Sequence, residues 1–336
     1  MRPLDLLTIP LSWCYALGVG VRHLLYDEHI LPSHTVSVPT ICVGNLAVGG
    51  TGKTPHVEYL LRLLSHHYKV AVLSRGYKRK THGFVIADTS SNASTIGDEA
   101  MQIHSKFPHV PVAVCEDRVK GVRLLQKRIE GLQVVLLDDA YQHRAICCGY
   151  YILLTPCDQL YIDDHLLPWG RLRDLKEQSQ KANMIIVTKC PDDMQPIDQR
   201  VISNRLGLAT FQQLCFSHIR YGEIAAQGRP LVVTGIAQTD YLMEHIRRQF
   251  PKAELMAFSD HHAFTPADIR RIEERARGFD FVLITEKDYQ RFLLTPLPEH
   301  LGDRLQTIPI EVDLRDQQPD FDRAILTYVR EALRKN

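Results

Sequence analysis

The segment AVGGTGKT, residues 47–54, combines glycines, a lysine and a threonine in a pattern typical of phosphate-binding loops. In such loops the lysine contacts the β- and γ-phosphates of a nucleotide and the hydroxyl group contacts Mg²⁺, roles that Lys53 and Thr54 could fill. The usual pattern begins with a glycine where this chain has Ala47. The later glycines still let the backbone approach a phosphate closely. The predicted nucleotide-binding residues of this loop are Gly49, Gly50, Thr51, Gly52, Lys53 and Thr54.

A second group of residues could complete a magnesium site. The apolar run VVLL ends in Asp138 and Asp139, and Mg²⁺ beside a triphosphate usually takes one or two carboxylates. Aspartates after a strand often only cap a turn, but a phosphate loop upstream favours a metal site made by Thr54, Asp138 and Asp139. Gln142 and His143 follow within one turn, and hydrogen bonds that hold the loop would also explain them.

Transfer of a phosphoryl group to an alcohol also benefits from a base near the hydroxyl group. Asp98 and Glu99 begin a predicted helix, where helix capping alone would explain two carboxylates. Asp260, His261 and His262 follow a predicted strand in the second half of the chain and could face the first half across a cleft. Isolated histidines are usually structural or solvated, so the residues alone leave a catalytic role open at both places.

Three basic clusters lie at residues 74–80, 116–128 and 169–176. Most such charges form a solvated surface. A cluster at the end of a strand is a better candidate for holding an anionic substrate or the transferring phosphate. Arg75 stands in such a place, because it directly follows the apolar run KVAVLS.

The elements that position these residues alternate between strands and helices. Short apolar runs bounded by turn signals recur over residues 35–189, and stretches with helical periodicity, such as 56–67 and 118–129, lie between them. Strands that alternate with helices indicate a largely parallel sheet covered on both faces. Functional residues should then gather at the carboxyl ends of the strands.

A second α/β unit follows the first. Residues 211–225 form two short extended pieces that could make a connecting ribbon, and four further apolar runs alternate with helical segments after them. We therefore predict an α/β protein in which a phosphate-loop kinase-like, largely parallel sheet domain is joined to a second, smaller α/β domain by a short β-ribbon linker. The predicted divisions are an N-terminal hydrophobic helix at 1–30, a nucleotide-binding kinase domain at 31–208, a two-stranded linker at 209–227 and a smaller C-terminal domain at 228–336.

Composition limits the class of protein. The chain has 336 residues, enough for two cores, and its 45% hydrophobic and 24% charged residues are typical of a globular protein. The net charge of +1 gives no overall attraction to nucleic acid. Eight scattered cysteines without a C-x-x-C pair indicate a reduced, cytosolic protein without structural zinc.

The N-terminal segment is hydrophobic without being a clear membrane span. Residues 6–21 carry no charge, but they are fewer than the roughly 20 residues of a spanning helix, and Pro10 interrupts them. A secretory signal does not fit, because Asp5 offsets Arg2 and no small-x-small cleavage site follows. A helix with these properties suits either a membrane interface or packing on the protein core, and the residues alone leave both open.

Taken in order, these fragments resemble the tetraacyldisaccharide 4'-kinase family, the lipid A kinases of Gram-negative bacteria. The resemblance runs over residues 43–288. Its matching segments are VGNLAVGGTGKTP, LSRGY, GDEA, EDR, LLDDAYQHR, LPWGRLRD, VTK, TGIA, FSDHHAFT and TEKD. The phosphate loop and the DDxxQHR segment are the most specific of these. The family also lacks the leading glycine of the loop, so Ala47 agrees with the resemblance.

The resemblance implies that ATP is the phosphate donor, that Mg²⁺ is required, and that the 4'-hydroxyl group of a tetraacyldisaccharide 1-phosphate is the acceptor, which gives lipid IVA. It matches Asp98 to the family's catalytic aspartate and His261, rather than His262, to the histidine that supports it. Asp139 and Lys53 are the other implied catalytic residues. Closure of the two domains would bring His261 toward Asp98.

The resemblance also adds binding residues. Asn45 lies where the family carries a glycine-asparagine pair before the loop, so we add it to the expected nucleotide-binding residues. Basic side chains would steady phosphate groups. The expected substrate-binding residues are Arg75, Tyr77, Arg118, Gln142, His143 and Arg171.

The family's N-terminal helix is membrane-associated, which favours an interfacial helix at residues 4–26 and implies a peripheral protein on the cytoplasmic face of the bacterial inner membrane. The expected partners are the acylated disaccharide lipid and the membrane surface, with no nucleic acid and no obligate protein partner. One alternative is a phosphate-loop ATPase that acts on a protein or metal partner at the membrane, although Val48 stands where such proteins often carry a lysine. Another is a non-enzymatic nucleotide-binding module tethered to a membrane.

Overall fold

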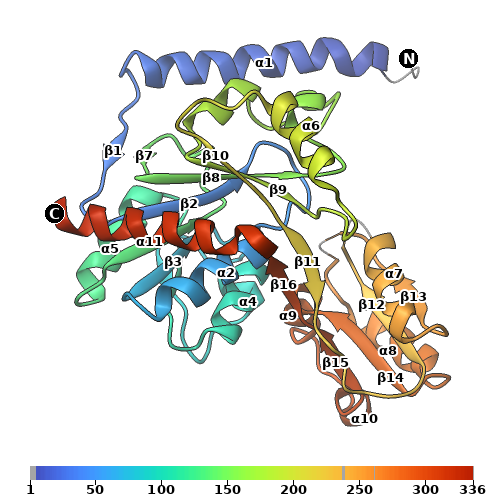
Figure 1. The fold of residues 1–336 in the computed structure, drawn as a ribbon. Coiled ribbons are helices and arrows are strands. Elements are labelled where there is room, and N and C mark those ends of the chain that lie inside the picture. Colours follow the sequence, from blue (N-terminus) through green and yellow to red (C-terminus); the bar gives the residue numbers. More distant parts are fainter. Residues whose placement is uncertain (1–4, 237–238, 261, 336) are drawn as a thin grey trace.

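The computed structural model describes residues 5–236, 239–260 and 262–335, which form two α/β units with a long helix lying across the larger one (Figure 1). The larger unit is built on an eight-stranded sheet in the order β10-β9-β8-β2-β6-β3-β5-β4. Each neighbouring pair is parallel except β4 with β5. The strands are β2 (Thr40–Asn45), β3 (Val70–Ser74), β4 (Val85–Ile86), β5 (Val112–Val114), β6 (Val134–Asp138), β8 (Tyr150–Pro156), β9 (Met184–Thr188) and β10 (Gln213–Phe216).

Helices cover both faces of this sheet. Because side chains alternate between the faces of a strand, the apolar runs supply two separate cores, one under α2, α4 and α11 and the other under α5 and α6. This doubly covered and largely parallel sheet confirms the predicted fold class. The helices of the unit are α2 (Lys53–Ser65), α3 (Ala93–Ile96), α4 (Asp98–Lys106), α5 (Arg118–Arg128), α6 (Pro196–Leu206) and α11 (Gln318–Lys335).

The sheet places the predicted site residues at the carboxyl ends of its inner strands. Strands β2 and β6 are parallel neighbours, with Val43 paired to Asp138, so the phosphate loop after β2 and the two aspartates at the end of β6 leave the sheet side by side. Strand β3 pairs with the other side of β6 and leads to Arg75. The carboxyl ends of these three strands therefore converge, as parallel strands require.

The smaller unit is a four-stranded parallel sheet in the order β13-β12-β14-β15. Helices α8 and α9 cover one of its cores, and α7 covers the other. Its strands are β12 (Pro230–Thr234), β13 (Glu254–Ala257), β14 (Phe281–Thr285) and β15 (Leu305–Ile308), and its helices are α7 (Asp240–Gln249), α8 (Pro266–Ala276), α9 (Glu286–Phe292) and α10 (Glu299–Gly302).

A ribbon joins the units, but its course differs from the expected two-stranded linker at 209–227. Strand β10 is the edge of the large sheet, and only Ser217 separates it from β11 (His218–Tyr221), a link too short for a hairpin turn. The partner of β11 is instead β16 (Ile310–Asp313), in antiparallel pairing. After β16 the chain returns, and α11 buries Phe321 and other residues in the first core, so the C-terminal segment does not belong with the smaller unit as the division at 228–336 assumed.

Helix α1 (Asp5–Asp27) continues through Pro10 and lies along the larger unit (Figure 1). Its inner side makes polar contacts: Ser12 Oγ donates to the carbonyl of Leu166 at 2.8 Å, and His23 Nε2 lies 2.5 Å from Asp174 Oδ1. Its outer side exposes large apolar residues. These are Leu11, Trp13, Leu17, Val21 and Leu24. No described helix is long and apolar enough to cross a membrane.

The remaining short elements connect these parts. They are β1 (His34–Thr35) and β7 (Ile146–Cys147), which pair in parallel, and the 3-10 helices Tyr161–Asp163, Lys176–Lys181 and Arg315–Gln317.

Candidate active site

The phosphate loop connects β2 to α2. Gly49 and Gly52 have φ values of 110° and 86°, a backbone region that residues with a β-carbon rarely adopt. Ala47, at the position of the missing glycine, has no positive φ and forms a β-bridge with Leu172. A side chain is therefore tolerated at Ala47, because that residue is held in an extended pairing.

Asn45, the last residue of β2, stabilises the phosphate loop by hydrogen bonds. Its Nδ2 donates to Thr51 Oγ1 at 2.8 Å, and its Oδ1 accepts from Arg173 Nη2 at 2.6 Å. Gln142 Nε2 donates to the Asn45 carbonyl at 2.6 Å. Both side chains thus act on the shape of the loop in this structure, and Gln142 fits the alternative in which it holds the loop by hydrogen bonds.

Asp139 forms ion pairs with Lys53 of the phosphate loop and with Arg173. Lys53 Nζ lies 3.8 Å from Asp139 Oδ1, and Arg173 donates to both carboxylate oxygens, one of them at 3.1 Å. Burial alone would raise the pKa of Asp139, but the charges of Lys53 and Arg173 outweigh burial and hold this pKa well below its ordinary value. Asp139 is therefore a fixed negative charge beside the lysine of the loop.

Arg173 was not among the predicted residues, although Arg171 was. Arg171 Nε pairs with Asp164 Oδ2 at 3.0 Å, and its Nη1 lies 4.0 Å from where a β-carbon of Gly49 would stand. Two arginines two residues apart share one basic segment, so only their tertiary contacts distinguish them. The structure places Arg171 beside the glycines of the loop and Arg173 on Asp139.

Asp138 has a different environment from Asp139. Its side chain is fully buried, and neither carboxylate oxygen has a hydrogen-bond partner among the described residues. Burial, together with the charges of Glu99 and Asp139, raises the pKa of Asp138 above its ordinary value. A buried carboxylate without a polar partner is rare, and this one ends β6, the parallel neighbour of the strand β2 that leads into the phosphate loop.

Asp98 begins α4, directly after Gly97, whose φ of 90° again needs glycine. Its Oδ1 accepts from the backbone amide of Glu99 at 3.0 Å, and Arg291 Nε of the smaller unit lies 3.7 Å from its Oδ2. Glu99 pairs with Lys287 at 3.0 Å. The structure therefore brings the smaller unit to Asp98 through Arg291, which the sequence did not single out, and to Glu99 through Lys287 of the TEKD segment.

The predicted histidine, His261, lies outside the described residues. Its neighbour His262 is described, and its Nε2 lies 3.0 Å from Asp268 Oδ2 while its ring packs against Phe258 and Phe264. These contacts give His262 a structural role within the smaller unit.

The other predicted substrate residues fall into two groups. Arg75 and Tyr77 are exposed after β3. Arg118 is buried at the start of α5, where its Nη2 donates to the carbonyl of Asp139 at 3.2 Å. Arg118 thus holds the backbone of the aspartate pair, and Arg75 and Tyr77 are accessible to a ligand.

His143 lines a cavity of about 740 Å³ between α5 and the segment that follows α1. Its Nε2 is buried without a hydrogen-bond partner among the described residues. Burial and the charge of Arg118 lower the pKa of His143 to about 4, so the ring is neutral near pH 7. Lys120, Arg123 and Lys127 line the same cavity.

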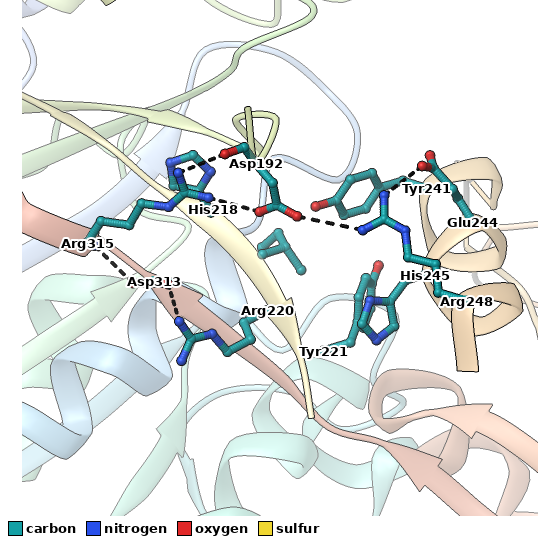
Figure 2. Close-up of a pocket in the computed structure, with 11 residues that line it drawn as sticks. Asp192, His218, Arg220, Tyr221, Tyr241, Glu244, His245, Arg248, Asp313 and Arg315 are labelled. Atoms are coloured by element: carbon teal, nitrogen blue, oxygen red, sulfur yellow. Dashed lines mark hydrogen bonds and ion pairs between the residues drawn. The ribbon is translucent and has the colours of Figure 1, made fainter. Parts of the chain in front are cut away.

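A second cavity, of about 390 Å³, lies at the ribbon and contains none of the predicted site residues (Figure 2). Asp192 from the larger unit reaches across it to Arg315 at 3.0 Å and to Arg248 of α7 at 4.0 Å. This cavity belongs to the joint between the two units.

A parallel sheet whose strand ends carry a glycine-rich loop, a lysine, two aspartates and a nearby carboxylate defines a phosphotransferase of the phosphate-loop class. Residues 4–330 match the family described as Tetraacyldisaccharide-1-P 4'-kinase. The chain belongs to this family.

Individual relatives agree with this assignment. A tetraacyldisaccharide 4'-kinase of Bacteroides fragilis is 44% identical over 97% of this chain and 93% of its own length. One of Flavobacterium johnsoniae is 41% identical over 99% of both chains. The crystal structure of LpxK from Aquifex aeolicus in complex with ATP has a TM-score of 0.74 and 26% identity, and the match covers 96% of this chain and 98% of that one. The family resemblance read from the sequence is thereby confirmed.

Proposed function

We propose that this protein transfers the γ-phosphoryl group of ATP to the 4'-hydroxyl group of a tetraacyldisaccharide 1-phosphate, giving lipid IVA. The observation that carries the proposal is the family match over residues 4–330 in a chain that keeps an intact phosphate loop. The LpxK of Aquifex aeolicus, which has the same fold over nearly the whole chain, crystallised in complex with ATP, and this supports ATP as the donor here.

The residues present fit a magnesium ion. Asp138 offers two buried oxygens without partners among the described residues, and Thr54 and Asp139 lie at the same edge of the sheet. Mg²⁺ in nucleotide sites takes one or two carboxylates and keeps its other positions for phosphate oxygens and water. We propose that Thr54, Asp138 and Asp139 hold it, and that when bound it offsets the negative charge of the phosphates.

We propose the following roles for side chains of this protein in phosphoryl transfer. Lys53 and the amides of the loop would hold the β- and γ-phosphates, since the loop leads directly into the N-terminus of α2, where backbone amides favour an anion. Asp98 accepts the proton of the acceptor hydroxyl group, and His261 supports Asp98. Asp139 acts together with Lys53, whose Nζ lies 3.8 Å from the Oδ1 of Asp139.

The acceptor would lie on the side of His143. The cavity there combines an apolar wall with the cationic side chains of α5, which suits a phosphorylated lipid. We keep six residues as proposed contacts of this substrate. They are Arg75, Tyr77, Arg118, Gln142, His143 and Arg171.

An assay with purified full-length protein tests the activity. Labelled ATP and a tetraacylated disaccharide 1-phosphate are incubated together, and label is expected in the lipid, with Lys53→Met as the background. Label only in inorganic phosphate would favour the ATPase alternative. ATP binding without any turnover would favour the nucleotide-binding module.

We also propose that the protein is peripheral to the cytoplasmic face of the inner membrane and that α1 makes the contact. Trp13 and Leu17 are each 70% exposed on the side of α1 that faces away from the protein. Aromatic and aliphatic side chains in this arrangement enter the boundary between headgroups and acyl chains. The protein would then bind its lipid substrate at the membrane surface.

Liposome sedimentation tests this contact. The double variant Trp13→Glu/Leu17→Glu should bind vesicles of phosphatidylethanolamine and phosphatidylglycerol about tenfold or more weakly, because burial of one large apolar side chain is worth about 1.5–3 kcal/mol. Ile197→Glu is the matched control, since Ile197 is 63% exposed on α6. Equal binding of the double variant and the wild type would rule out α1 as the membrane contact.

A further inference from the structure

Helices α4 and α9 lie side by side where the smaller unit meets the larger one (Figure 1). Three ion pairs link them: α4 carries two carboxylates at its start and a lysine at its end, and α9 places an opposite charge against each of them. The pairs are Asp98–Arg291 at 3.7 Å, Glu99–Lys287 at 3.0 Å and Lys106–Glu286 at 2.7 Å. Two of the three are made by the first two residues of α4, where the proposed base is located.

Arg291 is held firmly by the smaller unit. Asp288, which is fully buried, accepts hydrogen bonds from Thr234 Oγ1 at 2.8 Å, from the Gly235 amide at 2.9 Å and from Thr285 Oγ1 at 2.7 Å. Arg291 Nη2 donates to the other oxygen of the same carboxylate. The TEKD segment thus ties two strands to the guanidinium group of Arg291.

The remaining side of this guanidinium group faces Asp98. Arg291 and Asp98 have side chains that are 8% and 7% exposed. Arg291 Nε has no hydrogen-bond partner among the described residues, and Asp98 Oδ2 is within ion-pair distance of it. Water is largely excluded here, so the attraction between the two charges is much stronger than at a surface.

We propose that Arg291 is a positioning residue for phosphoryl transfer: it brings a fixed positive charge from the smaller unit that orients the carboxylate of Asp98 toward the acceptor hydroxyl group. The inference rests on the proposed function, in which Asp98 is the base. Lys287 acts in the same way on the neighbouring Glu99, with a smaller effect because its side chain is more exposed.

Arg291 needs no contact with either substrate for this role. The phosphate loop and the two aspartates at the end of β6 belong to the larger unit alone, so ATP binding should not depend on Arg291. Turnover should depend on it, because a misplacement of a catalytic group by about 1 Å can cost on the order of 100-fold in rate. The docking of α9 on α4 would thus orient Asp98 so that it can accept the proton of the acceptor hydroxyl group.

The first test is steady-state kinetics of Arg291→Gln in the full-length protein, with ATP and tetraacyldisaccharide 1-phosphate as substrates. We expect kcat to fall roughly 10- to 100-fold while KM for ATP stays within twofold. Arg275→Gln is the matched control, because Arg275 forms an exposed ion pair inside the smaller unit. A kcat of Arg291→Gln equal to that of the control would overturn the proposal.

A double-mutant cycle separates this inference from the proposed function. If Asp98→Asn loses most of its turnover and Arg291→Gln lowers kcat no further in that background, Arg291 acts through Asp98. If Arg291→Gln has its full effect in the Asp98→Asn background, the positioning role is overturned and the base role of Asp98 stands. If Asp98→Asn keeps its turnover, the base assignment itself fails, and the inference falls with it.

Loss of the contact with Asp288 could unfold the smaller unit, so a second variant is needed. Lys287→Met leaves the Asp288 network untouched. We expect a roughly threefold to tenfold fall in kcat with an unchanged melting temperature. Arg291→Lys, which keeps the charge, should recover part of the activity lost in Arg291→Gln; no difference between these two variants would also contradict the inference.

Discussion

Among the described residues, two junctions between the units are built differently. At the contact of α4 with α9, the paired side chains are shielded, and Lys106 reaches Glu58, whose side chain is 0% exposed, at 2.6 Å. At the ribbon cavity, Asp192 is 63% exposed and its partner Arg248 is 64% exposed (Figure 2). Both junctions use carboxylates and cations, but only the first keeps them away from water.

This difference in shielding decides what each junction can do. An exposed ion pair contributes about 0–1 kcal/mol, so the ribbon side restrains the units only weakly. Removal of one partner from a buried pair leaves an uncompensated charge and costs about 3–5 kcal/mol. The shielded junction, which is the one that contains Asp98, should therefore fix the relative position of the two units.

The largest expected effect is that of Asp98→Asn. If Asp98 is the base at the shielded junction, kcat should fall roughly 100-fold or more, with ATP affinity unchanged when measured by calorimetry. Asp240→Asn is a matched control, because Asp240 is also the first residue of its helix and is exposed. A kcat of Asp98→Asn within threefold of wild type would show that the proton is handled elsewhere.

A smaller but pH-dependent effect is expected for Lys106→Met. Burial raises the pKa of Glu58, and the charge of Lys106 opposes this rise. Without Lys106 the native state should hold a proton on Glu58 that the unfolded state releases, so stability should fall as the pH rises above about 4.3. We expect a loss of about 3 kcal/mol at pH 8 and clearly less at pH 5, measured by urea unfolding.

The control for this variant is Lys252→Met, at an exposed lysine, which should change stability by less than about 0.5 kcal/mol at either pH. An equal loss for Lys106→Met at pH 5 and pH 8 would mean that Glu58 does not take up a proton.

The smallest effect is expected at the ribbon. In Asp192→Asn, Arg248 keeps its pair with Glu244, and Arg315 keeps its hydrogen bond to the carbonyl of residue 192. The free energy of unfolding should change by less than about 1 kcal/mol, and kcat should stay within twofold. A tenfold fall in kcat would show that the ribbon junction also constrains the site and that the comparison does not hold.

The phosphate loop and the end of β6 were predictable because each is a local pattern. A glycine-rich turn between a strand and a helix, or two aspartates after an apolar run, occupies consecutive residues, and parallel pairing of β2 with β6 then brings the two together. The assignment of Asp138 and Asp139 to Mg²⁺ stays a proposal, supported by the oxygens of Asp138 that lack partners among the described residues.

Arg173 and Arg291 could not be found in this way. Arg173 is one of several basic residues in its segment, and its contact with Asp139 bridges 34 positions. Arg291 stands in an ordinary amphipathic stretch, 193 positions from Asp98 by residue number. Ion pairs over such separations depend on the fold, because nothing in the local sequence distinguishes one arginine from the next.

The pairing of the strands at the ribbon was also not predictable from the local sequence. Two short extended pieces in 211–225 were expected to make a connecting two-stranded ribbon, but hydrogen bonding joins one piece to β9 and the other to β16. In the structure only Ser217 lies between the two pieces, and a hairpin needs a turn of at least two residues, so each piece pairs with a different strand.

By itself, the sequence determined the family, the phosphate loop, the acidic pair and the alternation of strands and helices, because these depend on neighbouring residues and on the regular spacing of apolar side chains. Only the tertiary structure decided which arginine lies beside which aspartate, where α11 packs, and which side of α1 faces outward. Those features depend on contacts between segments far apart in the chain, and such contacts are selected when the whole molecule buries its apolar surface and pairs its buried charges.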